Sequence, residues 1–178
     1  MSDLVLAAQP GSQAVLVDFS EPMLERASVS LAAYAGRWQV VRGDLCDPAW
    51  YEALPAGRYD AVLSGLAIHH LPSERKRALF AEAFELLEPG GMFVNMDYVA
   101  IGGPLEGLFD EQMLANAVRH EHDQGGTRSA QEVDCEDDDD RPDSVEDQVR
   151  WLRDAGFEQA EVHFKWAEAA VFGAIKPS

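Results

Sequence analysis

Short apolar segments of strand length alternate with helix-forming segments along most of the chain, and this alternation constrains the fold more than any other feature. Segments that are apolar on both faces suit strands buried inside a parallel sheet. Regular alternation of such strands with helices predicts β-α-β units. The four predicted strands of this kind are residues 14–17, 38–41, 59–63 and 92–96.

Helix signals lie between these strands. Ser20 is a good N-cap and Pro22 falls in the first turn, so we expect a helix here that Gly36 ends. Ser73 is expected to cap a second helix, whose apolar residues recur at helical spacing. The Pro-Gly-Gly sequence at 89–91 should break this helix before the fourth strand.

One stretch, at about 100–143, interrupts the alternation. It contains a predicted helix at about 105–122 and an acidic tract at 135–141, which we interpret as a solvated loop. We therefore expect a single domain over residues 1–178 that carries a helical and acidic insertion at about 100–143.

The end of the chain returns to a regular pattern. Ser144 and Asp147 form a variant of the capping box, so a helix should begin there and stop at Gly156. Residues 161–166 and 169–175 predict two strands that are joined tightly enough for an antiparallel hairpin. The expected fold class is α/β: a Rossmann-like, doubly wound, mostly parallel sheet with helices on both faces and an antiparallel hairpin at its C-terminal edge.

The charge of the chain limits its partners. The 178 residues include 14 Lys and Arg against 32 Asp and Glu, a formal net charge of −18. Such a surface repels phosphate backbones and anionic lipids, which disfavours a nucleic-acid partner and a membrane. Cys46 and Cys135 have no metal-ligand or redox spacing, and the N-terminus has no signal-peptide pattern. We expect an acidic, cytoplasmic protein.

Polar residues follow the predicted strands, where the ligand of an open α/β sheet is expected to lie. Asp18 follows the first strand and Asp44 the second, while Ser64 and Gly65 follow the third. The first acid can accept both hydroxyls of a ribose, and the second can accept an exocyclic amine. Apolar walls for a purine ring would come from Phe19, Met23 and Leu45. Acids in such positions also cap helices, but both acids in this order favour an adenosine-bearing ligand.

Five motifs occur in a fixed order along the chain. The first two are Asp-Phe-Ser-Glu-Pro-Met-Leu-Glu-Arg-Ala at 18–27 and Gly-Asp-Leu at 43–45. Residues 59–72 contain Tyr-Asp-Ala-Val-Leu-Ser-Gly, residues 86–93 contain Leu-Glu-Pro-Gly-Gly, and residues 151–157 read Trp-Leu-Arg-Asp-Ala-Gly-Phe. This series resembles the motifs of class I S-adenosylmethionine-dependent methyltransferases, among them the small methyltransferase-domain proteins of bacteria and archaea. The resemblance implies methyl transfer from S-adenosylmethionine to an acceptor, for which the acidic surface favours a small molecule.

The resemblance also implies a role for each matching residue. Asp18 would bind the ribose hydroxyls, and Asp44 would meet the adenine amino group. Ser64 and Gly65 would contact the cofactor through their backbone near its amino-acid end. The side chains that would pack against the adenine are Phe19, Met23 and Leu45.

No catalytic residue is assigned. Methyl transfer from a sulfonium is an in-line displacement in which the cofactor supplies the chemistry, so the protein mainly positions the acceptor and excludes water. His69 and His70 are the candidates for a base if the acceptor needs one. The alternative is that one packs within the fold and the other hydrogen-bonds a loop. No metal site is expected, because the 135–141 tract lacks the ordered alternation of a calcium loop.

One motif of the family is absent from the chain. It is the glycine-rich loop after the first strand, through which the backbone approaches the methionine part of the cofactor. Residues 4–8 resemble the end of the helix that follows this loop, so we expect a chain that lacks the first strand and the loop. An inactive binding or scaffold protein on the methyltransferase fold is therefore the alternative function. A dinucleotide-dependent oxidoreductase fits less well, because it needs the same loop.

The absent strand would lie centrally, between the strands predicted at 14–17 and 59–63. Without it, two inner strands expose backbone donors and acceptors that require other partners. Three outcomes are open: the two strands pair directly, a second chain fills the slot as in a homodimer, or the sequence is a fragment.

Overall fold

The computed structural model describes residues 1–103, 107–108, 111, 115–116, 118–119 and 140–178. The predicted helix at 105–122 and the acidic tract at 135–141 therefore lie largely outside the described residues. In chain order, with η for 3₁₀ helices, the elements are α1 (Ser2–Ala8), β1 (Ala14–Asp18), α2 (Glu21–Ser30), η1 (Ala32–Tyr34), β2 (Trp38–Arg42), η2 (Trp50–Ala53), β3 (Tyr59–Gly65), η3 (Ile68–His70), α3 (Ser73–Leu86), β4 (Leu87–Tyr98), α6 (Val145–Asp154), β5 (Glu158–Trp166) and β6 (Ala169–Ile175). None of the described helices combines the length and the hydrophobicity that crossing a membrane requires.

The strands form two separate sheets. β1 and β2 pair in parallel, and the second sheet has the order β3-β4-β6-β5. β3 and β4 are parallel, whereas β6 runs antiparallel to both of its neighbours, β4 and β5. All the predicted strands are present. The parallel pairing expected for the β-α-β part of the chain and the antiparallel C-terminal hairpin are confirmed.

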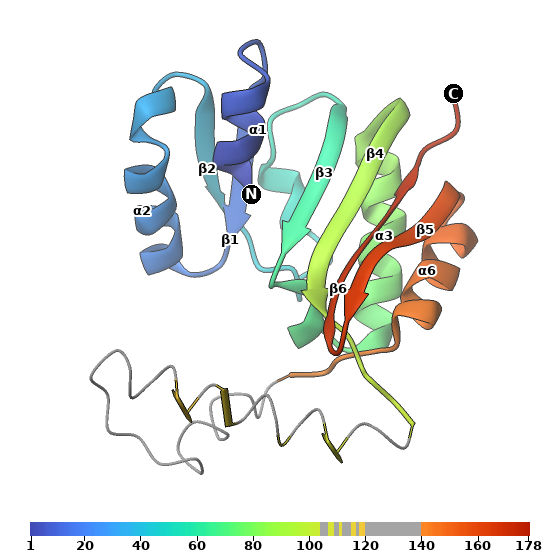
Figure 1. Ribbon diagram of the computed structural model, residues 1–178. Coiled ribbons are helices and arrows are strands. Elements are labelled where there is room, and N and C mark those ends of the chain that lie inside the picture. Colours follow the sequence, from blue (N-terminus) through green and yellow to red (C-terminus); the bar gives the residue numbers. More distant parts are fainter. Residues whose placement is uncertain (104–106, 109–110, 112–114, 117, 120–139) are drawn as a thin grey trace.

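The two sheets are not joined by a strand. β1 pairs with β2 and β3 pairs with β4, and the described residues contain no ladder between β1 and β3. Direct pairing of these two strands, one of the three expected outcomes, is therefore wrong. The residues before β1 form α1, which Figure 1 shows in front of the space between the two sheets. Arg37 holds α1 in place by donating to the carbonyl oxygens of Leu6 at 3.0 Å and Gln9 at 2.6 Å.

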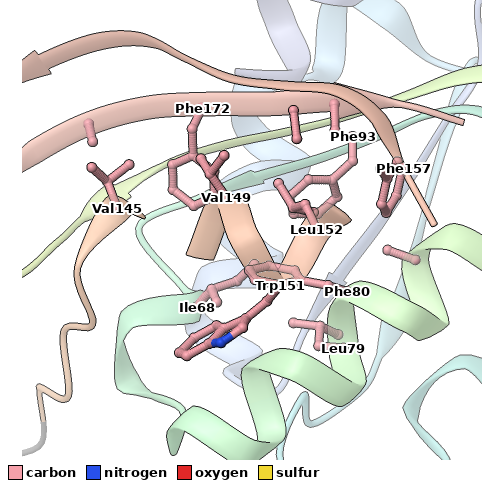
Figure 2. Packing of buried hydrophobic residues seen from close by; sticks show 14 of the residues in the cluster. Ile68, Leu79, Phe80, Phe93, Val145, Val149, Trp151, Leu152, Phe157 and Phe172 are labelled. Carbon is pink, nitrogen blue, oxygen red and sulfur yellow. The ribbon is translucent and has the colours of Figure 1, made fainter. Parts of the chain in front are cut away.

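The main core lies between the four-stranded sheet and the helices α3 and α6 (Figure 1). Phe80 of α3 contacts Phe93 of β4 edge to face, with ring centroids 5.4 Å apart. Figure 2 shows Leu152 of α6 beside Phe93, and Val149 of the same helix beside Phe172 of β6. Burying a side chain of this size contributes roughly 1.5–3 kcal/mol, so this cluster is the main source of stability for the C-terminal part of the fold.

The opposite face of the four-stranded sheet is less covered. Cross-strand partners share a face, so Met96 of β4, Val171 of β6 and Phe164 of β5 point to the same side. α1 reaches this side at one end, where Met1 lies beside Gly65. The large apolar side chains that stay exposed on these strands include Leu63, Met92, Met96, Tyr98, Phe164 and Trp166.

Three helix boundaries differ from the predicted ones. α2 ends at Ser30 and not at Gly36, and a separate 3₁₀ helix, η1, follows it. Pro72, not Ser73, is the N-cap residue of α3, and the Ser73 hydroxyl instead donates to Asp143 Oδ1 at 2.8 Å. α3 ends at Leu86, and the Pro-Gly-Gly sequence lies within β4. Gly90 has a φ of +82°, and a Cβ on Gly91 would stand 2.9 Å from a backbone oxygen. The two glycines thus form a close turn at the start of the strand instead of ending the helix.

The start of α6 follows the predicted capping box. Ser144 Oγ accepts a hydrogen bond from the backbone N–H of Asp147 at 3.1 Å. The Asp147 carboxylate accepts from the Ser144 hydroxyl at 2.8 Å, whereas a full capping box would use the Ser144 backbone N–H. The serine lowers the pKa of Asp147, with a further contribution from Arg150.

Candidate functional site

A cavity of 240 Å³ lies between β1 and β3, at the place where the sheet is divided. Its lining includes residues from both strands and from the loops that follow β2 and β3. Four of the seven predicted cofactor-binding residues line it: Asp18, Leu45, Ser64 and Gly65.

A second hollow adjoins the first along the same two strands. Val15, Tyr59, Ala61 and Leu63 line both, and the second hollow is also lined by Ser2, Val5 and Gln9 of the α1 region. The gap between β1 and β3 is therefore open over much of the length of these strands and not only at the cavity.

The two acids that follow the first strands have the same local geometry. Asp18 Oδ1 accepts from the backbone N–H of Ser20 at 2.8 Å, and Asp44 Oδ1 accepts from that of Cys46 at 2.8 Å. Gly43 donates to the Asp18 carbonyl oxygen at 3.1 Å, which holds the two strand ends together. Among the described residues no hydrogen bond to Asp18 Oδ2 is found, whereas the Asp44 carboxylate also interacts with the Cys46 thiol. Each carboxylate thus stabilises its own turn, and that of Asp18 keeps one oxygen for a ligand.

The remaining three predicted residues lie outside the cavity lining. Phe19 is 65% exposed and Met23 is 52% exposed, both near the start of α2. Asp44 is exposed beside Leu45, which does line the cavity. An adenine ring would have to lie at the mouth of the cavity to touch all three.

The N-terminus lies against one part of the site. A Cβ placed on Gly65 would stand only 2.9 Å from the Met1 side chain, at Cε. Met1 therefore lies where the family resemblance implies the amino-acid end of the cofactor. This end of the site has no glycine-rich loop among the described residues.

The loop that carries Asp44 and Leu45 is fixed to α3. Arg75 donates through Nε to the Leu45 carbonyl oxygen at 2.6 Å and through both terminal nitrogens to Glu82, at 2.8 and 2.6 Å. Trp50 Nε1 donates to the same carboxylate at 2.7 Å. This support could not be predicted from the sequence, because Arg75 and Glu82 have the pattern of ordinary surface residues of a helix.

His69 is buried at the end of the sheet beside the cavity. It is 5% exposed, and its Nδ1 lies 2.5 Å from Oδ1 of the buried Asp97. Asp97 also accepts from the backbone N–H groups of Ile68 at 3.0 Å and His69 at 3.1 Å. Burial alone would lower the pKa of His69, but the hydrogen bond to Asp97 and the charges of Asp97 and Asp140 outweigh it and raise this pKa above its ordinary value. Asp97 lies near the carboxyl end of β4, as Asp18 lies at the end of β1, and this position is the signal that could have identified it.

His70 points to a different environment. It is exposed, and its Nδ1 lies 2.9 Å from Asp140 Oδ1, while His69 Nε2 lies 3.3 Å from the same oxygen. The two candidate bases thus meet at one carboxylate, and no sequence pattern predicts this contact.

The segment 140–144 is anchored to the fold by a buried lysine. Lys76 of α3 is fully buried, and its ammonium donates to the Arg141 carbonyl oxygen and, at 2.7 Å, to Asp143 Oδ2. Arg141 in turn donates its backbone N–H to the His69 carbonyl oxygen at 2.9 Å. These contacts hold Asp140 beside the two histidines.

Comparison with known proteins identifies the family. A model of the methyltransferase domain matches residues 3–91, half of the chain. The carboxy-S-adenosyl-L-methionine synthase of Helicobacter hepaticus is 25% identical over 152 residues, which cover 84% of this chain and 60% of that protein. The demethylmenaquinone methyltransferase of Leptospira interrogans is 33% identical over 88 residues, covering 49% of this chain and 34% of that protein.

The fold is found among solved structures as well. An O-methyltransferase family protein from Burkholderia thailandensis superposes with a TM-score of 0.68 at 16% identity, covering 98% of this chain and 46% of that one. The chain thus spans less than two thirds of the length of the relatives that it matches. It belongs to the methyltransferase-domain family and has the fold of the class I S-adenosylmethionine-dependent methyltransferases.

Proposed function

We propose that this chain binds S-adenosylmethionine in the cavity between β1 and β3 and takes part in methyl transfer to a small-molecule acceptor. The observation that carries the proposal is the cavity itself, since Asp18, Leu45, Ser64 and Gly65 line it at the carboxyl ends of their strands. The match of residues 3–91 to the methyltransferase domain supports the same cofactor.

In this proposal each acid binds the cofactor through its second oxygen. Asp18 accepts the ribose hydroxyls and Asp44 accepts the adenine amino group, while the turn hydrogen bonds hold both carboxylates in place. Ser64 and Gly65 contact the amino-acid end through their backbone, which requires the Met1 side chain to move from Gly65. The side chains proposed to enclose the adenine are Phe19, Met23 and Leu45.

The acceptor class rests on charge. A net charge of −18 disfavours polyanionic nucleic acids, and no basic patch was predicted that would offset it. The relatives carry two different named activities, a synthase and a methyltransferase, so they do not single out one acceptor. A base is needed only for a weakly nucleophilic acceptor, for which His69 and His70 remain the candidates. A cytoplasmic setting and a homodimer remain predictions of the same kind.

A second candidate function is that of a binding or scaffold protein without catalysis. The observation that favours it is the division of the sheet, because β1 and β3 border a gap and Met1 lies against Gly65. A cofactor site that lacks support on this side would bind weakly, and the fold would then serve another partner.

Isothermal titration calorimetry with S-adenosylmethionine and S-adenosylhomocysteine separates the two functions. We expect micromolar binding that Asp18→Ala abolishes. Asp18→Asn keeps an acceptor for the Ser20 N–H and should still weaken binding at least about tenfold, because a hydrogen bond to a charged group contributes about 1.5–3 kcal/mol.

Asp154→Ala is the matched control, because Asp154 is an exposed acid at the end of α6. It should bind like the unaltered chain. Absence of binding at millimolar ligand, or equal binding by the Asp18 and Asp154 variants, would contradict the proposal and favour the scaffold function.

A further inference from the structure

Three ligand atoms of metal-binding type converge where η3 meets the segment 140–144. His69 Nε2 and His70 Nδ1 lie 3.3 Å and 2.9 Å from one atom, Asp140 Oδ1. The three ligand atoms all lie within 4.8 Å of one another. Two imidazole nitrogens and one carboxylate oxygen are a donor set typical of Zn²⁺ and related divalent transition-metal ions.

The spacing of these atoms suits a shared ion. Ligands about 2.1 Å from a tetrahedral ion stand about 3.4 Å apart, and ligands at the same distance from an octahedral ion stand about 3.0 Å apart. The two nitrogen-to-oxygen distances, 3.3 Å and 2.9 Å, lie within about 0.5 Å of either value, and all three ligand atoms lie within 4.8 Å of one another. The side chains are thus close to a coordinating arrangement without any large movement.

His69 is also oriented as a metal ligand would be. Its Nδ1 contacts Asp97 Oδ1 at 2.5 Å, and Asp97 is itself held by two backbone N–H groups and by Asn95 Nδ2 at 3.2 Å. Histidines that bind metals almost always donate their other ring N–H to a carboxylate or carbonyl group in this way. This arrangement leaves the lone pair of Nε2 on the side of Asp140.

The local charge favours a cation. Asp97 and Asp140 bring two carboxylates to the two imidazoles. The nearest buried cation, Lys76, is already paired with Asp143 and the Arg141 carbonyl oxygen. A divalent ion would offset both carboxylates and take the place of a proton between His69 Nε2 and the Asp140 oxygen.

We propose that His69, His70 and Asp140 bind one divalent transition-metal ion, best matched by Zn²⁺, with Asp97 as the positioning residue for His69. The ion would join η3 to the segment 140–144. It would lie beside the cavity, because Ile68 of η3 lines that cavity. Three protein ligands leave a fourth position of a tetrahedral ion for water or an acceptor oxygen. No metal site was expected from the sequence, because the 135–141 tract lacks the pattern of a calcium loop. The proposed ligands come from two distant segments, which no local pattern brings together.

Metal binding can be measured without any cofactor or acceptor. The protein is freed of metal with a chelator and titrated with Zn²⁺ in competition with a chromophoric chelator, and then with Co²⁺ followed by visible absorption. We expect one equivalent of Zn²⁺ per chain. His70→Ala and Asp140→Asn should each weaken binding at least about tenfold, and Asp97→Asn should weaken it roughly 10–100-fold.

His163→Ala is the matched control, because His163 is an exposed histidine of β5 away from the cluster. It should bind Zn²⁺ like the unaltered chain, and Cys46→Ser should do the same. His70 is exposed, so its variant should keep the thermal unfolding profile of the parent, which shows that lost binding is not lost folding. Binding that persists in both His70→Ala and Asp140→Asn, that disappears in Cys46→Ser, or that is absent from the unaltered chain would overturn the proposal. Because the readout is metal stoichiometry, this result is independent of whether the chain binds S-adenosylmethionine.

Discussion

At the scale of single residues, the turn acids show how one carboxylate can have two roles. Asp18 and Asp44 each accept a backbone N–H two residues further along with one oxygen, at 2.8 Å in both cases. A carboxylate that only capped its turn could be replaced by asparagine at small cost, because the amide oxygen accepts the same hydrogen bond. Replacement by asparagine therefore separates the turn from the ligand-binding role of the charge.

Cys46 reports on the charge of Asp44. Burial raises the pKa of the Cys46 thiol, and the neighbouring Asp44 carboxylate raises it further. In a background in which Cys135 is replaced by serine, we expect Cys46 to react with iodoacetamide at pH 8 more slowly than a cysteine in a free peptide. Asp44→Asn should speed the reaction, because the thiolate loses a negative neighbour while the turn keeps its acceptor.

The same assay with Asp47→Asn gives the control, because Asp47 also accepts a backbone N–H two residues on and is no cause of the Cys46 pKa shift. An equal acceleration by both substitutions would mean that Asp44 does not act on the thiol through its charge.

At the scale of the elements, α3 positions the loop after β2. Glu82 accepts hydrogen bonds from both terminal nitrogens of Arg75 and from the indole N–H of Trp50. The Arg75 and Glu82 side chains are largely buried. The loop that presents Leu45 to the cavity is thus attached to the helix by one carboxylate and one guanidinium. Its position therefore depends on a charge on α3 as well as on the turn hydrogen bonds within the loop.

Glu82→Gln should destabilise the protein by about 1.5–3 kcal/mol, the range for hydrogen bonds to charged groups. The glutamine amide keeps one acceptor oxygen, so it cannot accept hydrogen bonds from both terminal nitrogens of Arg75 at once. Urea unfolding followed by circular dichroism measures the change. Glu85→Gln, at an exposed position of α3, should change the stability by less than about 0.5 kcal/mol. Equal midpoints for the two variants would show that the Arg75–Glu82 pair does not stabilise the fold.

The elements themselves could be predicted from sequence, whereas the contacts between them could not. β1, β2 and β3 follow from short apolar runs, and α6 follows from Ser144 and Gly156, because these signals act within a few residues. The meeting of Asp97 and Asp140 at His69 depends on how three distant segments pack. No periodicity or capping signal encodes such a meeting.

At the scale of the whole molecule, the division between the two sheets is the feature that separates this structure from a continuous sheet. β4 and β6 have a partner strand on both sides, whereas β1 and β3 each have one. The edges of β1 and β3 that face the gap therefore present backbone N–H groups without a strand partner. Stability should differ between the two groups of strands.

Hydrogen exchange should show this difference directly. We expect the amides of β4 and β6 to exchange slowly, through global unfolding, and about half of the amides in β1 and β3 to exchange much faster, because they lack a ladder hydrogen bond. Mass spectrometry of peptides from the four strands measures it. Equal protection of β1 and β4 would mean that another segment, or a second copy of the chain, fills the gap in solution.

A strand supplied to the gap should stabilise the whole molecule. We consider a fusion in which an apolar strand and a glycine-rich loop precede Met1. The added strand would pair on both sides, and each new hydrogen bond would contribute about 0.5–1.5 kcal/mol while apolar side chains such as Val15 and Leu63 become covered. We expect a higher thermal midpoint, slower exchange in β1 and β3, and tighter binding of S-adenosylmethionine as the loop displaces Met1 from Gly65.

The control is the same fusion with prolines at alternate positions of the added strand. Proline cannot donate to a strand ladder, so this fusion adds the same length of chain without pairing. It should leave the midpoint and the exchange of β1 and β3 unchanged. If the two fusions behave alike, the gap does not accept a strand, and the two sheets are stable as separate units, each with an edge strand beside the cavity.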